Sequence, residues 1–463
     1  MTATLTFLGA ARNVTGSRYL LRTAGAKILV DCGLFQEREN LGLNWENFGL
    51  YPPDIDAVVI THGHMDHCGW LPKLVKDGFR GAAHCTPATR DLAPIIMNDT
   101  ANIQVEDAKT KAKRHAREGR TGVREPKPLY DSADAAEAET RLRPLPLGEK
   151  REIAPGVTVE FGENGHILGA AWARIEADGT SVVFSGDVGR WDRPILNDPE
   201  PPCRTDYLVI ESTYGNRTHV AADVTEQLGL ALEEAAERGG NVLIPSFSVE
   251  RAQELLYSLS RLSAAGRLPQ KGVYLDSPMA IRVTELFAKH PEVYDDEMRT
   301  LVGTGHSPFA FPGLHFSSSS EESKALNDMK GGAVIVAGNG MCTGGRIKHH
   351  LFNHVSSPAT TVLFAGYQAS GTLGRQLLDG AKQIRLFNQA IPVGAKVGVI
   401  NGLSGHADET ELLRWAKSLC SAPKKCFVTH GDEEASAALA KTFRENLGWD
   451  AINPSLRDSA DLA

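Results

Sequence analysis

The sequence lacks three features that would indicate export or a membrane. Its seven cysteines are scattered and odd in number, and no two form a Cys-x-x-Cys pair. This pattern excludes a disulfide framework and indicates reduced thiols. No apolar run approaches the roughly 18 residues of a membrane span, and no basic patch followed by an apolar core begins the chain, as a secretory signal would. We therefore expect a cytoplasmic protein.

The chain also lacks the positive balance that is typical of nucleic-acid-binding proteins. Its 463 residues carry 49 Lys and Arg against 57 Asp and Glu, a net charge of −8. Such a balance argues against an overall basic surface but is compatible with a local basic groove. The length exceeds that of a single hydrophobic core, so two or three domains are expected.

Three imidazoles and a carboxylate follow a predicted buried strand, Ile55–Ile60. In an extended segment His62 and His64 point to the same side and can bind one cation. The chain then turns, so Asp66 and His67 leave it in other directions and suit a second cation. Imidazole and carboxylate together favour Zn²⁺ over Mg²⁺ or Ca²⁺. The alternative is a histidine-rich loop that binds metal incidentally, which four ligand-type residues at this spacing disfavour.

Three further side chains of ligand type stand beside predicted strands. Asp31 ends the strand-like run Lys27–Asp31, where it either caps a turn or orients a ligand histidine. His166 and Asp187 each lie in a glycine-flanked loop next to an apolar strand. A lone residue of either type is usually structural there, but beside the histidine cluster the two supply a third histidine and a bridging carboxylate. The surrounding strands predict an α/β sandwich of two sheets with flanking helices.

The pattern changes after residue 217. Residues 218–390 alternate helices with apolar strands, which is typical of a separate parallel-sheet α/β domain. Its loop Gly338–Arg346 follows a strand and precedes a helix, so its backbone N–H groups could hold a phosphate, although such turns are also glycine-rich for steric reasons alone. Short strands return near Lys396, with His406 and His430 in loops, and a frayed tail is predicted at the C-terminus.

One or two helices are predicted for residues 88–118, and their end is basic. Such a run could contact a phosphate backbone, but charge runs are more often solvated faces. The side chains concerned are Lys109, Lys111, Lys113, Arg114, His115, Arg117 and Arg120.

These motifs resemble those of the metallo-β-lactamase superfamily and specifically of its β-CASP nuclease branch. His62-x-His64-x-Asp66-His67 is similar to the superfamily signature, and Asp31, His166 and Asp187 fall where its other metal-site motifs fall. Three residues match the additional β-CASP motifs: Glu211, His406 and His430. The resemblance covers nearly the whole chain in the family's order. The Ser-Gly-His-Ala-Asp form around His406 is closer to the cleavage-and-polyadenylation endonuclease branch than to the RNase J branch.

The resemblance implies a four-layer αβ/βα metallo-β-lactamase sandwich made of residues 1–217 and 391–463. A parallel-sheet α/β β-CASP domain, residues 218–390, is inserted into it. Single-stranded RNA is expected in a groove between the two domains. Contacts with the RNA are expected from Ser246, Ser277, Gly340, Gly344 and Arg346.

The resemblance also implies a role for each residue of the site. His62, His64 and His166 would hold one Zn²⁺, and Asp66, His67 and His430 would hold a second. Asp187 would bridge the pair, and Asp31 would orient a ligand. A histidine oriented by a carboxylate is a natural proton donor, so Glu211 and His406 complete the catalytic set with Asp66 and Asp187. The prediction is a ribonuclease that leaves 5′-phosphate and 3′-hydroxyl ends; internal cutting is expected, with stepwise cutting from a 5′ end as the open alternative.

Three alternatives compete with this interpretation. A thioester hydrolase or lactamase has the same metal core but needs neither the inserted domain nor residues at the positions of Glu211 and His406. A DNA nuclease of the same family is disfavoured by His430, because the DNA-repair members carry valine there. An inactive scaffold of an RNA-processing complex would have lost ligands, whereas every ligand position is occupied here. The oligomeric state stays open, with a homodimer among the assemblies considered.

Overall fold

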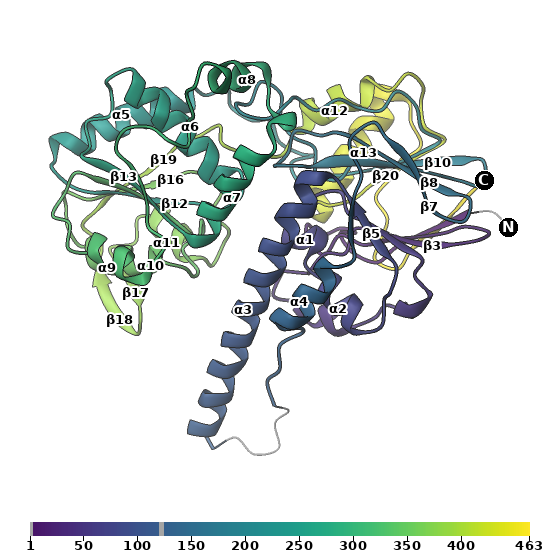
Figure 1. Ribbon diagram of the computed structural model, residues 1–463, viewed down its shortest axis with the longest axis horizontal. Coiled ribbons are helices and arrows are strands. Elements are labelled where there is room, and N and C mark those ends of the chain that lie inside the picture. Colours follow the sequence, from purple (N-terminus) through teal and green to yellow (C-terminus); the bar gives the residue numbers. More distant parts are fainter. Residues whose placement is uncertain (1–2, 120–124) are drawn as a thin grey trace. The chain divides into compact units, whose positions relative to one another are not determined.

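The computed structural model describes residues 3–119 and 125–463, which form two compact units (Figure 1). The first unit comprises Met1–Asp192, Asn197–Thr218 and His406–Ala463. The second comprises Arg193–Leu196 and His219–Gly405.

The first sheet of the first unit has seven strands in the order β22-β1-β2-β3-β4-β5-β6. Strands β22, β1, β2 and β3 pair antiparallel, and β3 to β6 run parallel. The strands are β1 (Ala3–Phe7), β2 (Tyr19–Arg22), β3 (Lys27–Val30), β4 (Ala57–Val59), β5 (Ala82–Cys85), β6 (Leu142–Pro144) and β22 (Ser459–Leu462).

The second sheet of this unit also has seven strands, in the order β21-β20-β11-β10-β9-β8-β7. Strands β7 to β10 pair antiparallel, and β10, β11, β20 and β21 run parallel. The strands are β7 (Lys150–Ala154), β8 (Val157–Glu163), β9 (Ala171–Ala177), β10 (Thr180–Phe184), β11 (Tyr207–Ile210), β20 (Lys425–Val428) and β21 (Ala451–Ile452).

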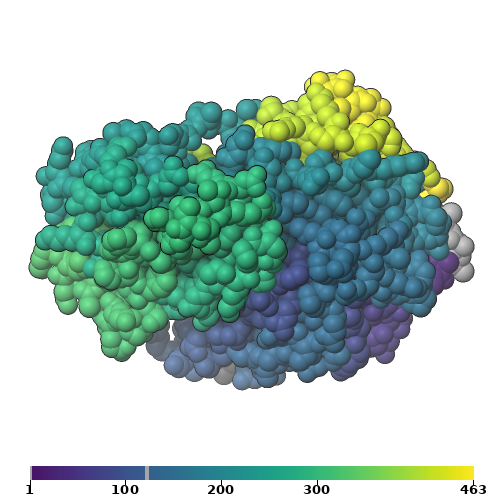
Figure 2. Space-filling model, turned by 45° about the horizontal axis from the view of Figure 1, so that its top comes forward, coloured from purple at the N-terminus to yellow at the C-terminus, as the bar shows by residue number. Residues whose placement is uncertain are grey.

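The two sheets pack face to face and are covered by helices. One buried cluster joins Leu5, Ile28 and Val59 of the first sheet to Phe161 and Val209 of the second. Helices α12 (Glu409–Lys417) and α13 (Glu433–Leu447) bury their apolar sides on the outer face of the second sheet, and Figure 2 shows these C-terminal residues in yellow on the surface of the unit. The other helices of the unit are α1 (Met65–Cys68), α2 (Leu71–Lys76), α3 (Pro87–Arg117) and α4 (Ser132–Glu139), with the 3-10 turns η1 (Leu41–Trp45) and η2 (Pro52–Asp54). The predicted α/β sandwich is confirmed.

The predicted helical stretch after the metal-type loop is the single helix α3. Its 31 residues correspond to a length of about 46 Å. The Thr86 side chain caps its first turn by accepting a hydrogen bond from the Thr89 backbone N–H. In Figure 1 the helix runs past α4. Arg120, the last of the basic residues singled out above, lies outside the described residues.

The second unit is built on a six-stranded parallel sheet in the order β14-β13-β15-β12-β16-β19. The strands are β12 (Val242–Pro245), β13 (Gly272–Asp276), β14 (Leu314–Phe316), β15 (Ala333–Ala337), β16 (Thr361–Phe364) and β19 (Lys396–Val399), with the hairpin β17 (Gln383–Leu386) and β18 (Gln389–Pro392). The helices are α5 (Val224–Glu237), α6 (Arg251–Ala264), α7 (Pro278–Lys289), α8 (Asp296–Gly303), α9 (Ser320–Leu326), α10 (Ile347–His354) and α11 (Leu373–Leu378), with the turn η3 (Pro291–Val293). The expected parallel α/β character is confirmed.

The structure differs from the sequence expectations at the C-terminal side. The return to the first domain was placed at residue 391, but β19 pairs in parallel with β16 of the second unit, and the chain rejoins the first unit at His406. The predicted frayed tail is wrong, because β22 pairs antiparallel with β1 and closes the edge of the first sheet.

The second unit contains a buried ion-pair network whose loss should be measurable. Asp276 is fully buried and accepts hydrogen bonds from Arg346 (2.7 Å), His350 (2.6 Å) and Ser323 (2.6 Å). Asp276→Asn should leave the Arg346 guanidinium without its counter-charge and lower the free energy of unfolding of this unit by about 3 kcal/mol.

Denaturant unfolding can assign this effect to the right unit. All six tryptophans of the chain lie in the first unit, so their fluorescence reports its unfolding alone, whereas circular dichroism reports both units. We expect the dichroism midpoint to fall while the fluorescence midpoint stays. The control is Asp296→Asn, since the Asp296 side chain is 98% exposed; an equal effect of both substitutions would contradict the network's role.

Candidate metal centre

Nine side chains of ligand or acid–base type meet at strand ends of the first unit. Strands β3 and β4 of the first sheet and β8, β10, β11 and β20 of the second end beside them. The residues are Asp31, His62, His67, His166, Asp187, Glu211 and His430, which are buried, and His64 and Asp66, which are half-buried. His406, at the start of the third segment of this unit, joins them.

Glycines allow the loop that carries four of these residues to pack closely. A Cβ atom on Gly33 would lie 1.5 Å from the carbonyl oxygen of Asp66, so any side chain there would push the loop away from β3. A Cβ atom on Gly63 would lie 2.8 Å from the Leu92 side chain of α3. The loop is therefore held between the end of β3 and the first turns of α3.

His62, His64 and His166 form the first cluster. The Nδ1 atom of His64 lies 3.1 Å from Nε2 of His62 and 3.3 Å from Nε2 of His166. Burial is the main cause that lowers the pKa of each ring, for His64 to about 3. Neutral imidazoles whose nitrogens converge in a dry site are the form in which histidine binds a metal.

Asp66, His67 and His430 form the second cluster. The Nε2 atoms of His67 and His430 are 2.9 Å apart, and the Oδ2 atom of Asp66 lies 3.6 Å from Nε2 of His430. Asp66 and His67 lie in α1, and His430 follows the end of β20. Two imidazoles and a carboxylate at these distances suit a cation with nitrogen and oxygen ligands.

Asp187 stands between the two clusters and turns one oxygen toward each. Its Oδ2 atom lies 3.4 Å from His62 and 3.5 Å from His166. Its Oδ1 atom lies 3.2 Å from His67 and 3.5 Å from His430, and no hydrogen-bond partner satisfies this buried oxygen. A carboxylate with one oxygen facing each cluster can bridge two cations. The donor set therefore fits two metal ions.

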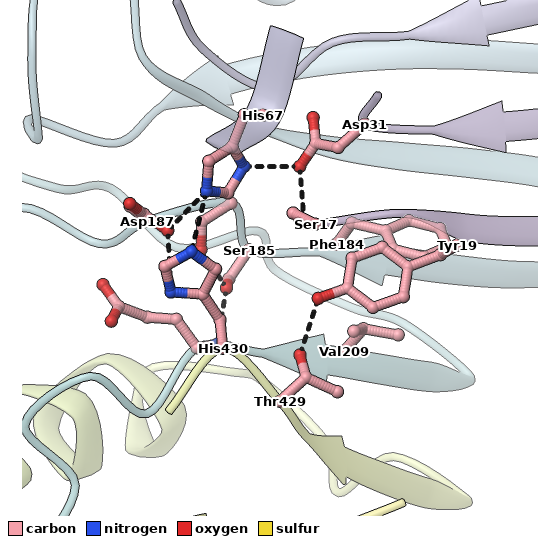
Figure 3. A pocket seen from close by; sticks show the side chains of 12 residues that line it. Ser17, Tyr19, Asp31, His67, Phe184, Ser185, Asp187, Val209, Thr429 and His430 are labelled. Atoms are coloured by element: carbon pink, nitrogen blue, oxygen red, sulfur yellow. Dashed lines mark hydrogen bonds and ion pairs between the residues drawn. The ribbon is translucent and has the colours of Figure 1, made fainter. Parts of the chain in front are cut away.

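Asp31 fixes the orientation of His67. Its Oδ2 atom lies 2.7 Å from Nδ1 of His67, and Figure 3 shows His67 between the carboxylates of Asp31 and Asp187. The other Asp31 oxygen accepts the backbone N–H of Thr61 at 2.9 Å. A proton held on Nδ1 of His67 leaves Nε2 of the same ring free to bind a metal ion in the second cluster.

Replacing Asp31 by asparagine should loosen the second cluster without removing a ligand. The amide cannot hold the His67 ring as the carboxylate does, so we expect metal affinity to fall about 10–100-fold. Competition with a chromophoric zinc chelator measures this change. Asp56→Asn, in the loop before β4, is the control, because its carboxylate binds the backbone of Lys27 on the surface. Unchanged affinity in Asp31→Asn would contradict the orienting role.

Glu211 and His406 form a pair beside the clusters. The Nδ1 atom of His406 lies 3.1 Å from Oε1 of Glu211 and 3.8 Å from Oδ2 of Asp187. Backbone N–H groups of Val188 and Thr213 also donate to Glu211. Burial lowers the pKa of His406, but the carboxylates of Glu211 and Asp187 outweigh it and raise the pKa to about 9. The ring is partly open to solvent.

Sequence reasoning missed two residues that hold the site together. Asn164 is buried, and its Nδ2 donates to the carbonyl oxygens of Ser185 and Asp187, which fixes the loop that presents the Asp187 carboxylate. The Thr61 hydroxyl lies 3.0 Å from both oxygens of Asp31. Both residues directly adjoin predicted motifs, and that adjacency is the signal that could have found them.

The residues predicted to contact RNA lie in the second unit, at the carboxyl ends of its parallel strands. Ser246 follows β12, Ser277 caps α7, and Gly340 and Gly344 lie in the loop after β15. Arg346 is bound within the unit, where it donates to Asp276 and to the backbone oxygens of Ser317 and Ser318.

Comparison with known proteins identifies the class. Residues 12–245 match the metallo-beta-lactamase superfamily, residues 252–377 the Beta-Casp domain, and residues 390–454 the Zn-dependent metallo-hydrolase RNA specificity domain. A crystal structure of a protein of unknown function from Enterococcus faecalis V583 shares the fold, with a TM-score of 0.56 and 14% identity over 100% of both chains. Fold and site together define a metallo-hydrolase of the metallo-β-lactamase type.

Curated relatives identify the family within that class. The chain is 39% identical to Ribonuclease TTHA0252 of Thermus thermophilus over 94% of each chain. It is 33% identical to Transcription termination factor FttA of Methanosarcina mazei, over 96% of this chain and 69% of the relative. The chain belongs to the β-CASP ribonuclease family.

Among residues 3–119 and 125–463, no helix combines the length and the apolar character that a membrane crossing requires.

Proposed function

We propose that this member of the family is a zinc-dependent endoribonuclease that leaves 5′-phosphate and 3′-hydroxyl ends. The observation that carries the proposal is the Asp187 carboxylate, whose two oxygens face two separate clusters of ligand side chains at 3.2–3.5 Å. Histidine-rich donor sets of this kind favour Zn²⁺. When bound, a pair of such ions lowers the pKa of a water molecule and neutralises charge on the phosphate oxygens.

The side chains of the two clusters would hold the ions and exclude bulk water. His62, His64 and His166 would hold one ion, and Asp66, His67 and His430 the other, with Asp187 shared. Burial of these residues excludes bulk water, which strengthens their electrostatic interactions with a phosphodiester.

His406 would act as the proton donor. It lies 3.1 Å from Glu211, which orients the ring and favours its protonated form. It would donate to the 3′ oxygen as that oxygen leaves phosphorus, so the downstream fragment would keep the 5′-phosphate.

Three observations support RNA as the substrate. The RNA specificity domain match spans residues 390–454 and so includes both His406 and His430. The relative from Thermus thermophilus is named a ribonuclease. In the β-CASP family, the DNA-repair members carry valine at the position of His430.

The seven cysteines are free, and five of them are buried. This supports a reducing cytoplasmic setting.

One assay tests the proposal. Single-stranded RNA labelled at its 5′ end, a second sample labelled at its 3′ end, and a DNA of the same sequence are incubated with the purified protein and zinc. We expect internal RNA fragments from both labels, uncut DNA, and fragments that a 5′-phosphate-dependent exonuclease degrades. Release of the 5′ nucleotide alone would indicate an exonuclease, and equal cutting of DNA would indicate a DNA nuclease; either result rejects the proposal.

A further inference from the structure

Beyond Gln104, α3 makes no hydrogen bond with another described segment of the chain. Eight residues between Ala88 and Ala101 are buried, but none of residues 102–117 is. The last hydrogen bonds that other segments make with the helix reach Asn102 and Gln104. We name the exposed part, Glu106–Arg117, the α3 arm. Figure 1 shows it running beyond α4.

The α3 arm carries more basic side chains than its own acids neutralise. Lys109 pairs with Glu106 at 2.7 Å. No carboxylate among residues 3–119 and 125–463 lies within ion-pair distance of the other four cations, which are Lys111, Lys113, Arg114 and Arg117. Lys109, Lys113 and Arg117 recur every four residues and so form one stripe with a step of about 6 Å along the helix.

Neither a solvated surface nor a gain in helix stability explains why these cations lie in one stripe. Like charges four residues apart destabilise an isolated helix, and both Lys109–Lys113 and Lys113–Arg117 are such pairs. Cations in the last turn compensate the helix dipole, but only Arg114, His115 and Arg117 lie in that turn. Lys109, Lys111 and Lys113 precede it. A stripe of this kind is complementary to a regularly spaced series of negative charges, as in a nucleic-acid backbone.

The first turn of the same helix is fixed to the metal centre. The hydroxyl groups of Thr86 and Thr89 donate to the carbonyl oxygen of Gly169 in the His166 loop, at 2.6 and 2.9 Å. Leu92 packs against Gly63 of the His62–His67 loop. Lys109 lies 22 residues beyond Pro87, which places it about 33 Å along the helix from the end that contacts the site.

We propose that the α3 arm is a docking site for the phosphate backbone of a single-stranded RNA whose scissile bond lies in the metal centre. The inference rests on the proposed function. The distance along α3 makes the contact dependent on RNA length, because only an RNA that spans it reaches both places. The arm then selects long substrates and takes no part in the chemistry.

The test replaces all five cations of the arm by glutamine: Lys109, Lys111, Lys113, Arg114 and Arg117. Fluorescence anisotropy measures the affinity for a long and a short labelled single-stranded RNA, in chelator so that neither is cut. We expect affinity for the long RNA to fall roughly tenfold, and the slope of log affinity against log salt to weaken by up to about 3.5. The short RNA should bind as it does to the wild type.

A matched control carries five glutamine replacements of exposed cations elsewhere in the first unit: Arg22, Arg151, Lys417, Lys441 and Arg457. Circular dichroism verifies that each variant keeps its helix content. With zinc added, the arm variant should show a raised KM for long RNA and an unchanged kcat. Binding of long RNA by the arm variant that equals that of the control variant would overturn the proposal, as would an equal loss for short and long RNA. Failure of the wild type to cut any RNA would reject the proposed function instead, and the binding data in chelator would still decide on the arm.

Discussion

Replacing Asp187 by asparagine is expected to reduce RNA cleavage more than any other single substitution. Asparagine has the same shape, but it carries no negative charge and offers an N–H₂ group where the second oxygen was. One of the two clusters therefore loses its oxygen ligand, and the shared bridge is lost. The loss of activity should exceed the roughly 10–100-fold that removal of an outer hydrogen-bond partner costs.

Metal content and cleavage rate should fall together in this variant. Elemental analysis should find clearly less zinc per chain than in the wild type, and single-turnover cleavage of labelled RNA should be slower. Asp206→Asn is the control, since Asp206 lies in the same unit but binds Ser181 away from the site. Full zinc content with full activity in Asp187→Asn would contradict the bridging role.

His406→Ala should have a different signature, with slow cleavage and intact metal content. General acid catalysis contributes typically about 10²–10⁴-fold, and the rate should fall by that amount. The six predicted ligands and Asp187 remain, so elemental analysis should match the wild type. His430→Ala, by contrast, should lower metal content and activity together, because His430 approaches both His67 and Asp66.

A sulfur-substituted substrate isolates the proton transfer itself. When sulfur replaces the 3′ bridging oxygen, the leaving thiolate needs no proton. His406→Ala should then cleave this RNA nearly as fast as the wild type does. Glu211→Gln, which weakens the orientation of His406, should show the same recovery to a smaller extent. If His406→Ala slows cleavage of both substrates by the same factor relative to the wild type, His406 is not the general acid.

The structure brings the predicted ligand residues together, because they stand in short motifs directly after strands. His62, His64, Asp66 and His67 lie within one loop, and the carboxyl ends of neighbouring strands bring Asp187 and His430 to it. The two-oxygen geometry of Asp187 could not be predicted, because it depends on how the two sheets pack. The roles of Asn164 and Thr61 depend on the same packing.

Pairing partners far apart in the sequence explain the remaining differences. The C-terminal strand β22 is short and polar, and only its pairing with β1 makes it a strand. In the same way β19 is assigned by its partner β16. The hydrogen bonds of Arg346 to Asp276 likewise depend on the adjacency of β13 and β15, and its contact with RNA stays a prediction.

Zinc stoichiometry of the wild-type protein, purified without added metal, tests the central claim most directly. Two clusters that share Asp187 predict about two Zn²⁺ per chain. Elemental analysis on a sample of known RNA-cleaving activity gives this number. A reproducible value near two in the active protein is the predicted result, and a value near one or zero with full activity would contradict the two-metal site.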